Sequence, residues 1–128
     1  MKLKTTVTCI ICLFLFANGA LSQQHLTTKQ YNYINSLNYN ELCDIYVEQH
    51  ITGREQAQPQ FKAIMAYKNN REKYKKCMLN KTKEAFSHNE LKELFIQPRN
   101  MDKSKYDKKL ARYYNELLPQ CSNVLAKN

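Results

Sequence analysis

The chain is poor in the residues that strand-rich domains use for their turns. It has two glycines and three prolines among 128 residues, and no tryptophan. Small β-sheet domains have turn residues about every 8–12 positions, and this sequence has no such regular spacing. The sparse turn chemistry argues against a sandwich or barrel and favours helices joined by short connections.

The sequence also lacks the motifs of enzymes and metal sites. It has no nucleophile elbow, phosphate-binding loop or glycine-rich turn. After residue 22, neither His-x-x-x-His nor Cys-x-x-Cys spacing occurs, and His25, His50 and His88 are far apart. We interpret all three as surface histidines. The sequence therefore predicts no catalytic residue, no metal and no cofactor.

Long hydrophobic runs are missing everywhere except near the N-terminus. Residues 1–4 are basic, residues 7–17 (VTCIICLFLFA) are apolar, and Ala20-Leu21-Ser22 places small residues at the −3 and −1 positions of a cleavage site. The apolar run is about half of the roughly 20 residues that a membrane-spanning helix needs. We expect residues 1–22 to be a secretory signal peptide and residues 23–128 to form one extracellular domain without a membrane span.

Removal of the signal peptide leaves an odd number of cysteines. Cys43, Cys77 and Cys121 remain after residue 22. In an oxidising compartment, three cysteines give one disulfide and one free thiol, or a link between two chains. Spacing leaves all three pairings open, with Cys43–Cys77 favoured. Cys121, near the C-terminus, is the candidate for a disulfide-linked homodimer.

Three capping boxes predict helix starts. In this pattern the first side chain binds the backbone amide three residues on, and a Glu or Gln there binds back. Thr27, Asn38 and Ser87 each begin such a box, and apolar residues follow each at helical spacing. Together with two further apolar stripes, these starts predict an all-α bundle of four to five helices with one disulfide.

The expected breaks lie at glycine, proline and asparagine. Gly53 is expected to stop the second helix, with a loop over residues 54–58. Pro59 suits the first turn of a third and longest helix, in which Asn69-Asn70 predicts a kink or break.

For the last two helices, Pro98 is expected to end the fourth. Asp102 or Ser104 is the expected cap of the fifth, and Pro119 its end. Residues 121–126 are expected to add one short turn.

Nine tyrosines make the expected core unusual. Tyrosine prefers sites where the ring is covered and the hydroxyl still reaches a partner. This composition predicts either a thin core or a groove lined with amphipathic rings.

Charge is distributed unevenly along the chain. Residues 23–60 carry a net charge of −2, whereas residues 61–83 hold eight basic residues against one acidic and carry +7. Such asymmetry favours contact with an anionic surface. The predicted partner-binding face consists of Lys68, Arg71, Lys73, Lys75, Lys76 and Lys83.

The preferred functional hypothesis follows from secretion and this basic face. We expect a non-enzymatic binding protein, an inhibitor, modulator or effector, that engages an acidic extracellular protein or anionic polymer. Secretion argues against nucleic acid as the partner. Asn80-Lys81-Thr82 fits the N-glycosylation acceptor, so Asn80 is a candidate glycosylation site.

The cysteine spacing supports an alternative. Cys43, Cys77 and Cys121 resemble the first, third and fourth cysteines of insect odorant-binding proteins, which are small secreted helical carriers of apolar ligands. Lys73 stands where that family has its second cysteine, and the chain ends seven residues after Cys121, before a fifth or sixth. The family's acidic character is also missing. The resemblance covers three positions and implies an extracellular carrier of a small apolar ligand.

Overall fold

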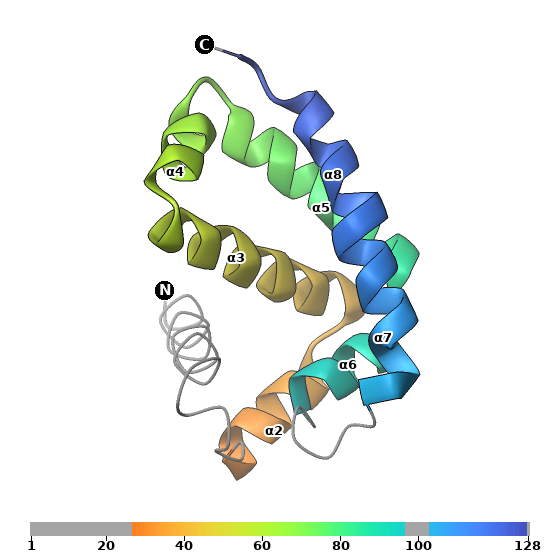
Figure 1. Ribbon diagram of the computed structural model, residues 1–128. Coiled ribbons are helices and arrows are strands. Elements are labelled where there is room, and N and C mark those ends of the chain that lie inside the picture. Colours follow the sequence, from red (N-terminus) through yellow and green to blue (C-terminus); the bar gives the residue numbers. More distant parts are fainter. Residues whose placement is uncertain (1–26, 97–102, 128) are drawn as a thin grey trace.

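The computed structural model describes residues 27–96 and 103–127, and helices make up most of both ranges (Figure 1). The elements are α2 (Thr28–Ser36), α3 (Tyr39–Ala57), α4 (Pro59–Ala66), α5 (Asn70–Ala85), α6 (His88–Ile96), α7 (Lys103–Arg112), η1 (Tyr113–Leu117), α8 (Leu118–Gln120) and η2 (Cys121–Val124). The last four follow one another without a gap, and we call residues 103–124 the C-terminal helix. The predicted all-α class is confirmed.

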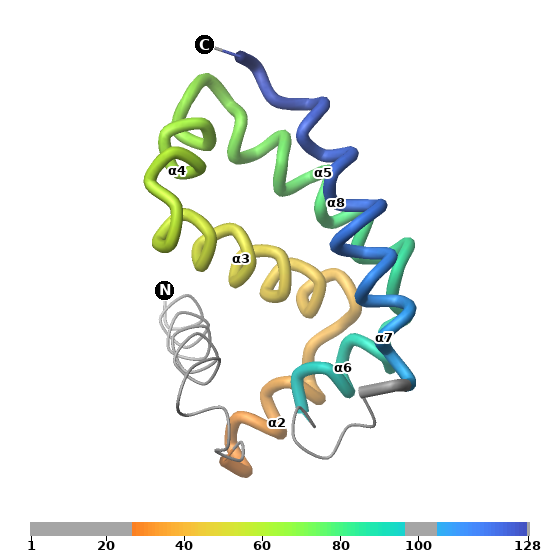
Figure 2. Tube along the Cα trace, viewed as in Figure 1, coloured from red at the N-terminus to blue at the C-terminus, as the bar shows by residue number. Residues whose placement is uncertain are grey.

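The helices are arranged around α3 and α5 (Figures 1 and 2). Those two helices pack against each other, and the short α4 connects them and contacts both. The C-terminal helix runs along α5, and α2 and α6 pack together next to the start of α3. With the C-terminal helix counted once, the described ranges hold six helices, slightly more than the four to five expected.

All three predicted capping boxes are present. Thr27 and Gln30 bind each other's backbone amides, and Asn38 and Glu41 do the same. The Ser87 amide donates to Glu90 Oε1 at 2.9 Å, and the Glu90 amide donates to Ser87 Oγ at 3.2 Å. A side-chain N-cap contributes about 1 kcal/mol of helix stability.

The expected stop at Gly53 and the expected loop over residues 54–58 are wrong, because α3 continues to Ala57. Gly53 has no positive φ and stays helical. The helix ends at Gln58, whose φ of −132° and ψ of 97° are extended. Proline disfavours the helical region for the residue before it, so Pro59 both ends α3 and starts α4, as its position at N1 predicted.

The break predicted at Asn69-Asn70 is confirmed and explains the additional helix. The third expected helix is two helices, α4 and α5, separated by residues 67–69. Lys68 takes a left-handed φ of 42° in this turn. Asn70 is completely buried and makes its hydrogen bonds to backbone groups outside its own helix.

Pro119 does not end the last helix, contrary to expectation, and helical structure continues to Val124. A π-helical turn precedes it, in which the Leu118 amide donates to the Tyr113 carbonyl. We attribute the continuation to this wider turn, because proline in a regular helix collides with the carbonyl four residues before it. The short turn expected after residue 120 is confirmed as η2.

Some predicted boundaries fall elsewhere. Ser104 lies inside α7, which begins at Lys103, and is therefore not its cap. Pro98, Asp102 and the expected signal peptide lie outside the described residues. Among the helices of residues 27–96 and 103–127, none combines the length and hydrophobicity needed to cross a bilayer.

Two clusters of buried side chains form the interior. The tyrosine core lies where α2, α6, the first half of α3 and η1 meet, and contains Ile34, Leu37, Leu42, Cys43, Ile45, Tyr46, Ala85, Phe86, Leu91, Phe95, Tyr113 and Leu117. The disulfide core lies between the second half of α3, α4, α5 and η2, and contains Val47, Ile51, Phe61, Met65, Tyr74, Met78 and Cys121.

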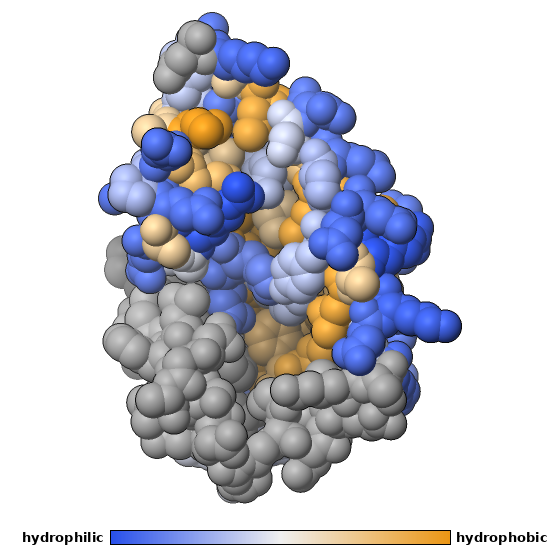
Figure 3. Space-filling view, in the orientation of Figure 1, coloured by the Kyte–Doolittle hydropathy of each residue, from blue (hydrophilic) through white to orange (hydrophobic). Residues whose placement is uncertain are grey.

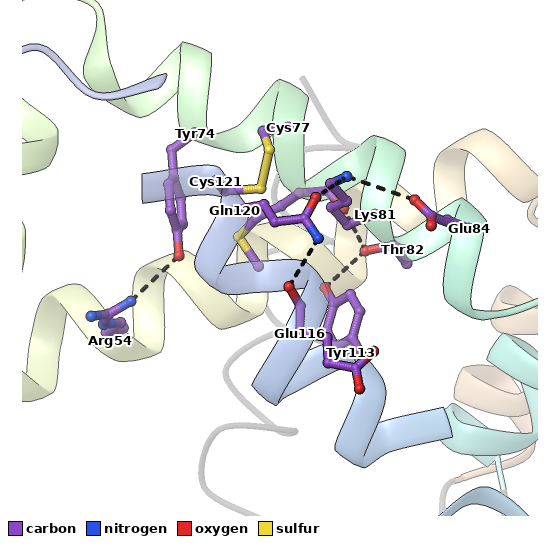
Figure 4. The surroundings of a disulfide bond; sticks show 11 residues. Arg54, Tyr74, Cys77, Lys81, Thr82, Glu84, Tyr113, Glu116, Gln120 and Cys121 are labelled. Atoms are coloured by element: carbon purple, nitrogen blue, oxygen red, sulfur yellow. Dashed lines mark hydrogen bonds and ion pairs between the residues drawn. A yellow bond between two sulfur atoms is a disulfide. The ribbon is translucent and has the colours of Figure 1, made fainter. Parts of the chain in front are cut away.

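The hydroxyl of Tyr113 has a partner although the side chain is fully buried. It lies 2.8 Å from Thr82 Oγ1, and Thr82 in turn donates to the Met78 carbonyl at 2.7 Å (Figure 4). The single Thr82 proton is thus used, so Tyr113 is the donor of the pair. At the edge of this core the Tyr39 hydroxyl donates to the Phe86 carbonyl. Ring burial with a satisfied hydroxyl is the arrangement that the tyrosine-rich sequence predicts.

The disulfide joins Cys77 to Cys121, with the two Cα atoms 5.6 Å apart (Figure 4). The favoured pairing of Cys43 with Cys77 is therefore wrong, because Cys43 faces the tyrosine core and Cys77 packs on the disulfide core. Cys121 is used within the chain and is not the thiol for a linked homodimer. Cys43 is free and buried, and burial raises the pKa of its thiol to about 11.

Candidate functional site

Two residues of the predicted basic face point toward α3. Arg71 Nη1 and Nη2 bind the two carboxylate oxygens of Glu48 at 2.8 and 3.0 Å, and Arg71 Nε lies 3.3 Å from Glu55. Lys75 Nζ lies 2.8 Å from Asp44 and 3.0 Å from Glu48. These five residues form a network that ties α5 to α3.

The network lowers the pKa of Glu48, chiefly through its hydrogen bonds from Arg71. The same bonds raise the pKa of Arg71, and contacts with Asp44 and Glu48 raise that of Lys75 against the opposing effect of burial. Part of the uneven charge along the sequence is therefore used inside the molecule, where basic residues of α5 pair with acidic residues of α3. The acidic residues of α3 neutralise part of the basic α5, so Arg71 and Lys75 are not available to a partner.

Three other predicted residues lie on the outer surface of α5. Lys73, Lys76 and Lys83 are exposed and follow one helical face; we call them the lysine stripe. Lys83 also contacts Asn40 and the ring of Tyr39.

Lys68 and Asn80 are exposed as well. Lys68 lies in the turn before α5, with Nζ 5.4 Å from the ring centre of Tyr67. Asn80 falls within the lysine stripe, although Thr82 of the same sequon is buried. A glycan on Asn80 would project from among these lysines.

A cavity of about 420 Å³ lies between α3, α4, α5 and the C-terminal helix. Figure 3 shows a hollow in this face of the molecule, with hydrophobic residues in its depth and hydrophilic residues beside it. The lining residues are His50, Ile51, Arg54, Phe61, Tyr74, Met78, Tyr114, Leu118, Pro119 and Ser122.

The apolar wall of the cavity belongs to the disulfide core. Ile51, Phe61, Tyr74 and Met78 are members of that core and come from three helices. Phe61 packs edge-on against Tyr74, with ring centres 5.6 Å apart. The cavity is therefore a gap within a hydrophobic cluster, open on one side and bounded by aromatic and aliphatic groups.

Two links hold the walls of the cavity in place. The disulfide joins α5, which supplies Tyr74 and Met78, to the C-terminal helix, which supplies the opposite wall. Asn70 also binds the chain after η2: its Nδ2 donates to the Ala126 carbonyl at 3.0 Å, and the Ala126 amide donates to Asn70 Oδ1 at 2.8 Å. Asn70 Nδ2 donates as well to the Ile64 carbonyl at the end of α4.

One polar corner of the cavity is formed by His50 and Tyr114. His50 Nδ1 donates to the Tyr46 carbonyl at 2.9 Å, because a carbonyl only accepts. His50 Nε2 then accepts from the Tyr114 hydroxyl at 2.6 Å. Burial lowers the pKa of His50, against the opposing effect of the Tyr46 bond, and burial raises the pKa of Tyr114. Near neutral pH the pair is uncharged, with both ring nitrogens engaged.

A second polar corner of the cavity is formed by Arg54. Its Nε donates to Gln58 Oε1 at 3.0 Å, and its Nη1 lies 3.4 Å from the Tyr74 hydroxyl (Figure 4). The guanidinium carbon lies 4.1 Å from the ring centre of Phe61. This cation–π contact and the two hydrogen bonds fix the guanidinium beside the apolar wall.

Sequence reasoning missed most of this site. Arg54 was expected in a loop, and His50 was expected on the surface, whereas it is half-buried and doubly hydrogen-bonded. His88 is also half-buried, stacked on Tyr39, and His25 lies outside the described residues.

A signal for Arg54 was present in the sequence, because residues 50, 51 and 54 share one face if α3 continues past Gly53. The described residues contain no group of three His, Cys, Asp or Glu side chains that would suit a metal ion.

No protein-family model, no curated protein and no solved structure matches this chain. The partial resemblance to odorant-binding proteins stays at three cysteine positions, two of which are bonded to each other here. The fold and the cavity therefore have to be interpreted from the residues of this chain alone.

Proposed function

We propose that the protein is a secreted, non-enzymatic binding protein that holds a small apolar ligand in the cavity between α3, α4, α5 and the C-terminal helix. The observation that supports this most is the cavity itself, about 420 Å³ within the disulfide core. Small-molecule sites are concave, mostly apolar, roughly 300–1,000 Å³ in volume, and carry a few polar groups.

The wall chemistry supports the same proposal. Phe61 and Tyr74 offer flat aromatic surface, and Met78 offers an unbranched side chain that adapts to different shapes. Leu118 and Pro119 complete the wall from the C-terminal helix. A ligand that fills this space buries apolar surface without opening the packed interior.

The polar corner supports binding rather than catalysis. A general base needs a free nitrogen within reach of substrate, whereas both nitrogens of His50 are engaged with Tyr46 and Tyr114. The raised pKa of Tyr114 keeps its phenol protonated.

The test uses a bulky substitution at an exposed residue that lines the cavity. Ser122 lines the cavity, and its neighbour Asn123 is equally on η2 and exposed but does not line it. The secreted protein, Ser122→Phe and Asn123→Phe are titrated with the neutral fluorescent probe N-phenyl-1-naphthylamine.

We expect the wild-type and Asn123→Phe proteins to bind the probe alike and Ser122→Phe to bind about tenfold more weakly, about 1.4 kcal/mol. No binding by the wild type, or equal binding by Ser122→Phe, would contradict the proposal.

A second candidate function rests on the lysine stripe. We propose Lys73, Lys76 and Lys83 as a surface for an acidic extracellular protein or anionic polymer, because no carboxylate of the described residues pairs with them. Such binding weakens as salt rises. Arg71 and Lys75 are left out, because reversing their charge would break the network with α3.

The experiment compares two triple variants of equal net charge. Lys73→Glu/Lys76→Glu/Lys83→Glu changes the stripe, and Lys29→Glu/Lys92→Glu/Lys108→Glu changes three lysines on α2, α6 and α7. Heparin serves as the anionic polymer, and the salt concentration at elution is measured. Only the stripe variant should elute markedly earlier; equal elution of both triples would exclude a specific role for the stripe.

A further inference from the structure

Arg54 differs from the other arginines whose side chains the structure describes. Arg71 binds Glu48 and Glu55, and Arg112 lies 3.1 Å from Glu84. Arg54 pairs with no carboxylate among residues 27–96 and 103–127. Its contacts are the Gln58 amide, the Tyr74 hydroxyl and the ring of Phe61, none of which is an acidic group.

The charge of Arg54 lies at the cavity, and part of its guanidinium is free to bind a further group. Arg54 lines the cavity together with Ile51 and Phe61, and its two hydrogen bonds use Nε and Nη1. Nη2 makes no hydrogen bond within the described ranges, and a guanidinium has five N–H donors in a rigid fork. Donor groups therefore remain for a further acceptor at the boundary between the apolar wall and solvent.

A cation at the edge of an apolar cavity selects for an amphiphile. We infer that the ligand carries an anionic head, a carboxylate, that binds Arg54, while its hydrocarbon part lies along Ile51, Met78 and Leu118. This inference rests on the proposed function of the cavity. The guanidinium is planar and matches a carboxylate with two parallel hydrogen bonds, which makes it a stronger partner than a point charge.

The surroundings of Arg54 favour an anion over a neutral or cationic head. The carboxylates of Glu48 and Glu55, which lie on the same helix as Arg54, both bind Arg71 and not Arg54. The other polar corner, His50 with Tyr114, is uncharged near neutral pH. The charge of Arg54 is thus the only one among the residues that line the cavity within the described chain.

The experiment varies the head of one hydrocarbon chain. Decanoate, 1-decanol and decylammonium are titrated at neutral pH, below the concentrations at which they form micelles, into the wild type, Arg54→Gln and Lys62→Gln. Arg54→Gln removes the charge at the cavity. Lys62→Gln removes one charge from an exposed position of α4 that does not line the cavity. Binding is measured by isothermal titration calorimetry.

We expect the wild type and Lys62→Gln to bind decanoate about tenfold more tightly than 1-decanol, about 1.4 kcal/mol, because the carboxylate makes a charge-assisted pair with Arg54. Decylammonium should bind most weakly. In Arg54→Gln, decanoate should fall to the affinity of 1-decanol while 1-decanol is unchanged. Equal affinity of the wild type for decanoate and 1-decanol, or equal weakening of both by Arg54→Gln, would overturn the anionic-head inference and leave the cavity function standing. Failure of the wild type to bind all three would overturn both.

Discussion

The two cores of the molecule are held together by different kinds of contact. In the tyrosine core aromatic rings pack on one another, and the buried hydroxyl of Tyr113 is satisfied by Thr82. The disulfide core contains the cavity and is held by a covalent bond and by the Asn70 bonds to Ala126. Contacts between rings are the feature of one region, and links across a cavity are the feature of the other.

The distribution of cysteine follows the same division. Cys43 lies unpaired in the tyrosine core, whereas Cys77 and Cys121 bridge the region with the cavity. A cavity removes packing contacts from the side chains that line it. A cross-link restores stability without filling that space, because it acts mainly on the unfolded chain. The comparison teaches that the covalent constraint lies in the core whose side chains line the cavity.

Removal of the disulfide should give the largest effect. Cys77→Ala/Cys121→Ala should lower the free energy of unfolding by about 4 kcal/mol, the entropic estimate for two cysteines with a sequence separation of 44. Urea denaturation measures the loss, and hydrogen exchange should show the disulfide core opening before the tyrosine core. Cys43→Ala is the control and should cost about 1–2 kcal/mol, because it only deletes a buried sulfur atom. An equal loss for both variants would remove the distinction between the two cores.

Replacement of Asn70 should have the next largest effect and should again be confined to the disulfide core. Asn70→Leu removes both hydrogen bonds to Ala126 and leaves the amide and carbonyl of that residue without their partner, at a cost of about 2–3 kcal/mol. The exchange rate of the Ala126 amide reports the loss directly. Asn69→Leu, on the exposed neighbour that makes no capping bond, should leave both quantities nearly unchanged. Unaltered protection of Ala126 in Asn70→Leu would contradict the role given to Asn70.

A smaller effect is expected in the tyrosine core. Tyr113→Phe keeps the ring and removes the hydroxyl that donates to Thr82, so the free energy of unfolding should fall by about 1 kcal/mol. Thr82 keeps its bond to the Met78 carbonyl and is not left without a partner. Thermal unfolding followed by circular dichroism measures the change, and Tyr31→Phe on the exposed face of α2 serves as the control. A loss equal to that of the control would mean that the buried hydroxyl adds no stability.

The smallest expected effect is the dependence of stability on pH at the polar corner. In the folded chain, burial lowers the pKa of His50 below its ordinary value of 6.5. As the pH falls below about 6.5, the unfolded chain takes up the proton first, so the free energy of unfolding declines until the pH has passed the folded pKa. Losses from Glu48, whose pKa is lowered from 4.5, begin only below that value.

Urea midpoints between pH 7 and pH 5 test this assignment. The wild type should lose stability across that window, and His50→Gln should show a flatter profile because the titrating group is gone. Parallel profiles for the two proteins would assign the pH dependence to other groups.

Much of the helical framework was predictable because its signals are local. The capping boxes at Thr27, Asn38 and Ser87 and the proline at residue 59 act through neighbours within one turn. The helix ends predicted at Gly53 and Pro119 are wrong because the effect of these residues depends on context. Gly53 adopts a helical φ, and Pro119 follows a π turn that leaves room for its ring.

The site was less predictable because it depends on packing between helices. Arg71 and Lys75 look like surface charge until α3 and α5 come together and Glu48 binds both. The cavity depends on contacts among four elements, and helical spacing could place only residues 50, 51 and 54 on one face of it. The candidate cysteines also belong to this region, but their pairing required the fold.

The covalent bond between the cavity walls links ligand binding to the redox equilibrium of Cys77 and Cys121. A ligand that binds only the oxidised, folded chain stabilises that form by about 1.4 kcal/mol for each tenfold excess over its Kd. For a two-electron couple this corresponds to about 30 mV in the reduction potential of Cys77–Cys121. The loaded protein would then resist reduction more strongly than the empty one, and the disulfide would report through its redox equilibrium whether the cavity is filled.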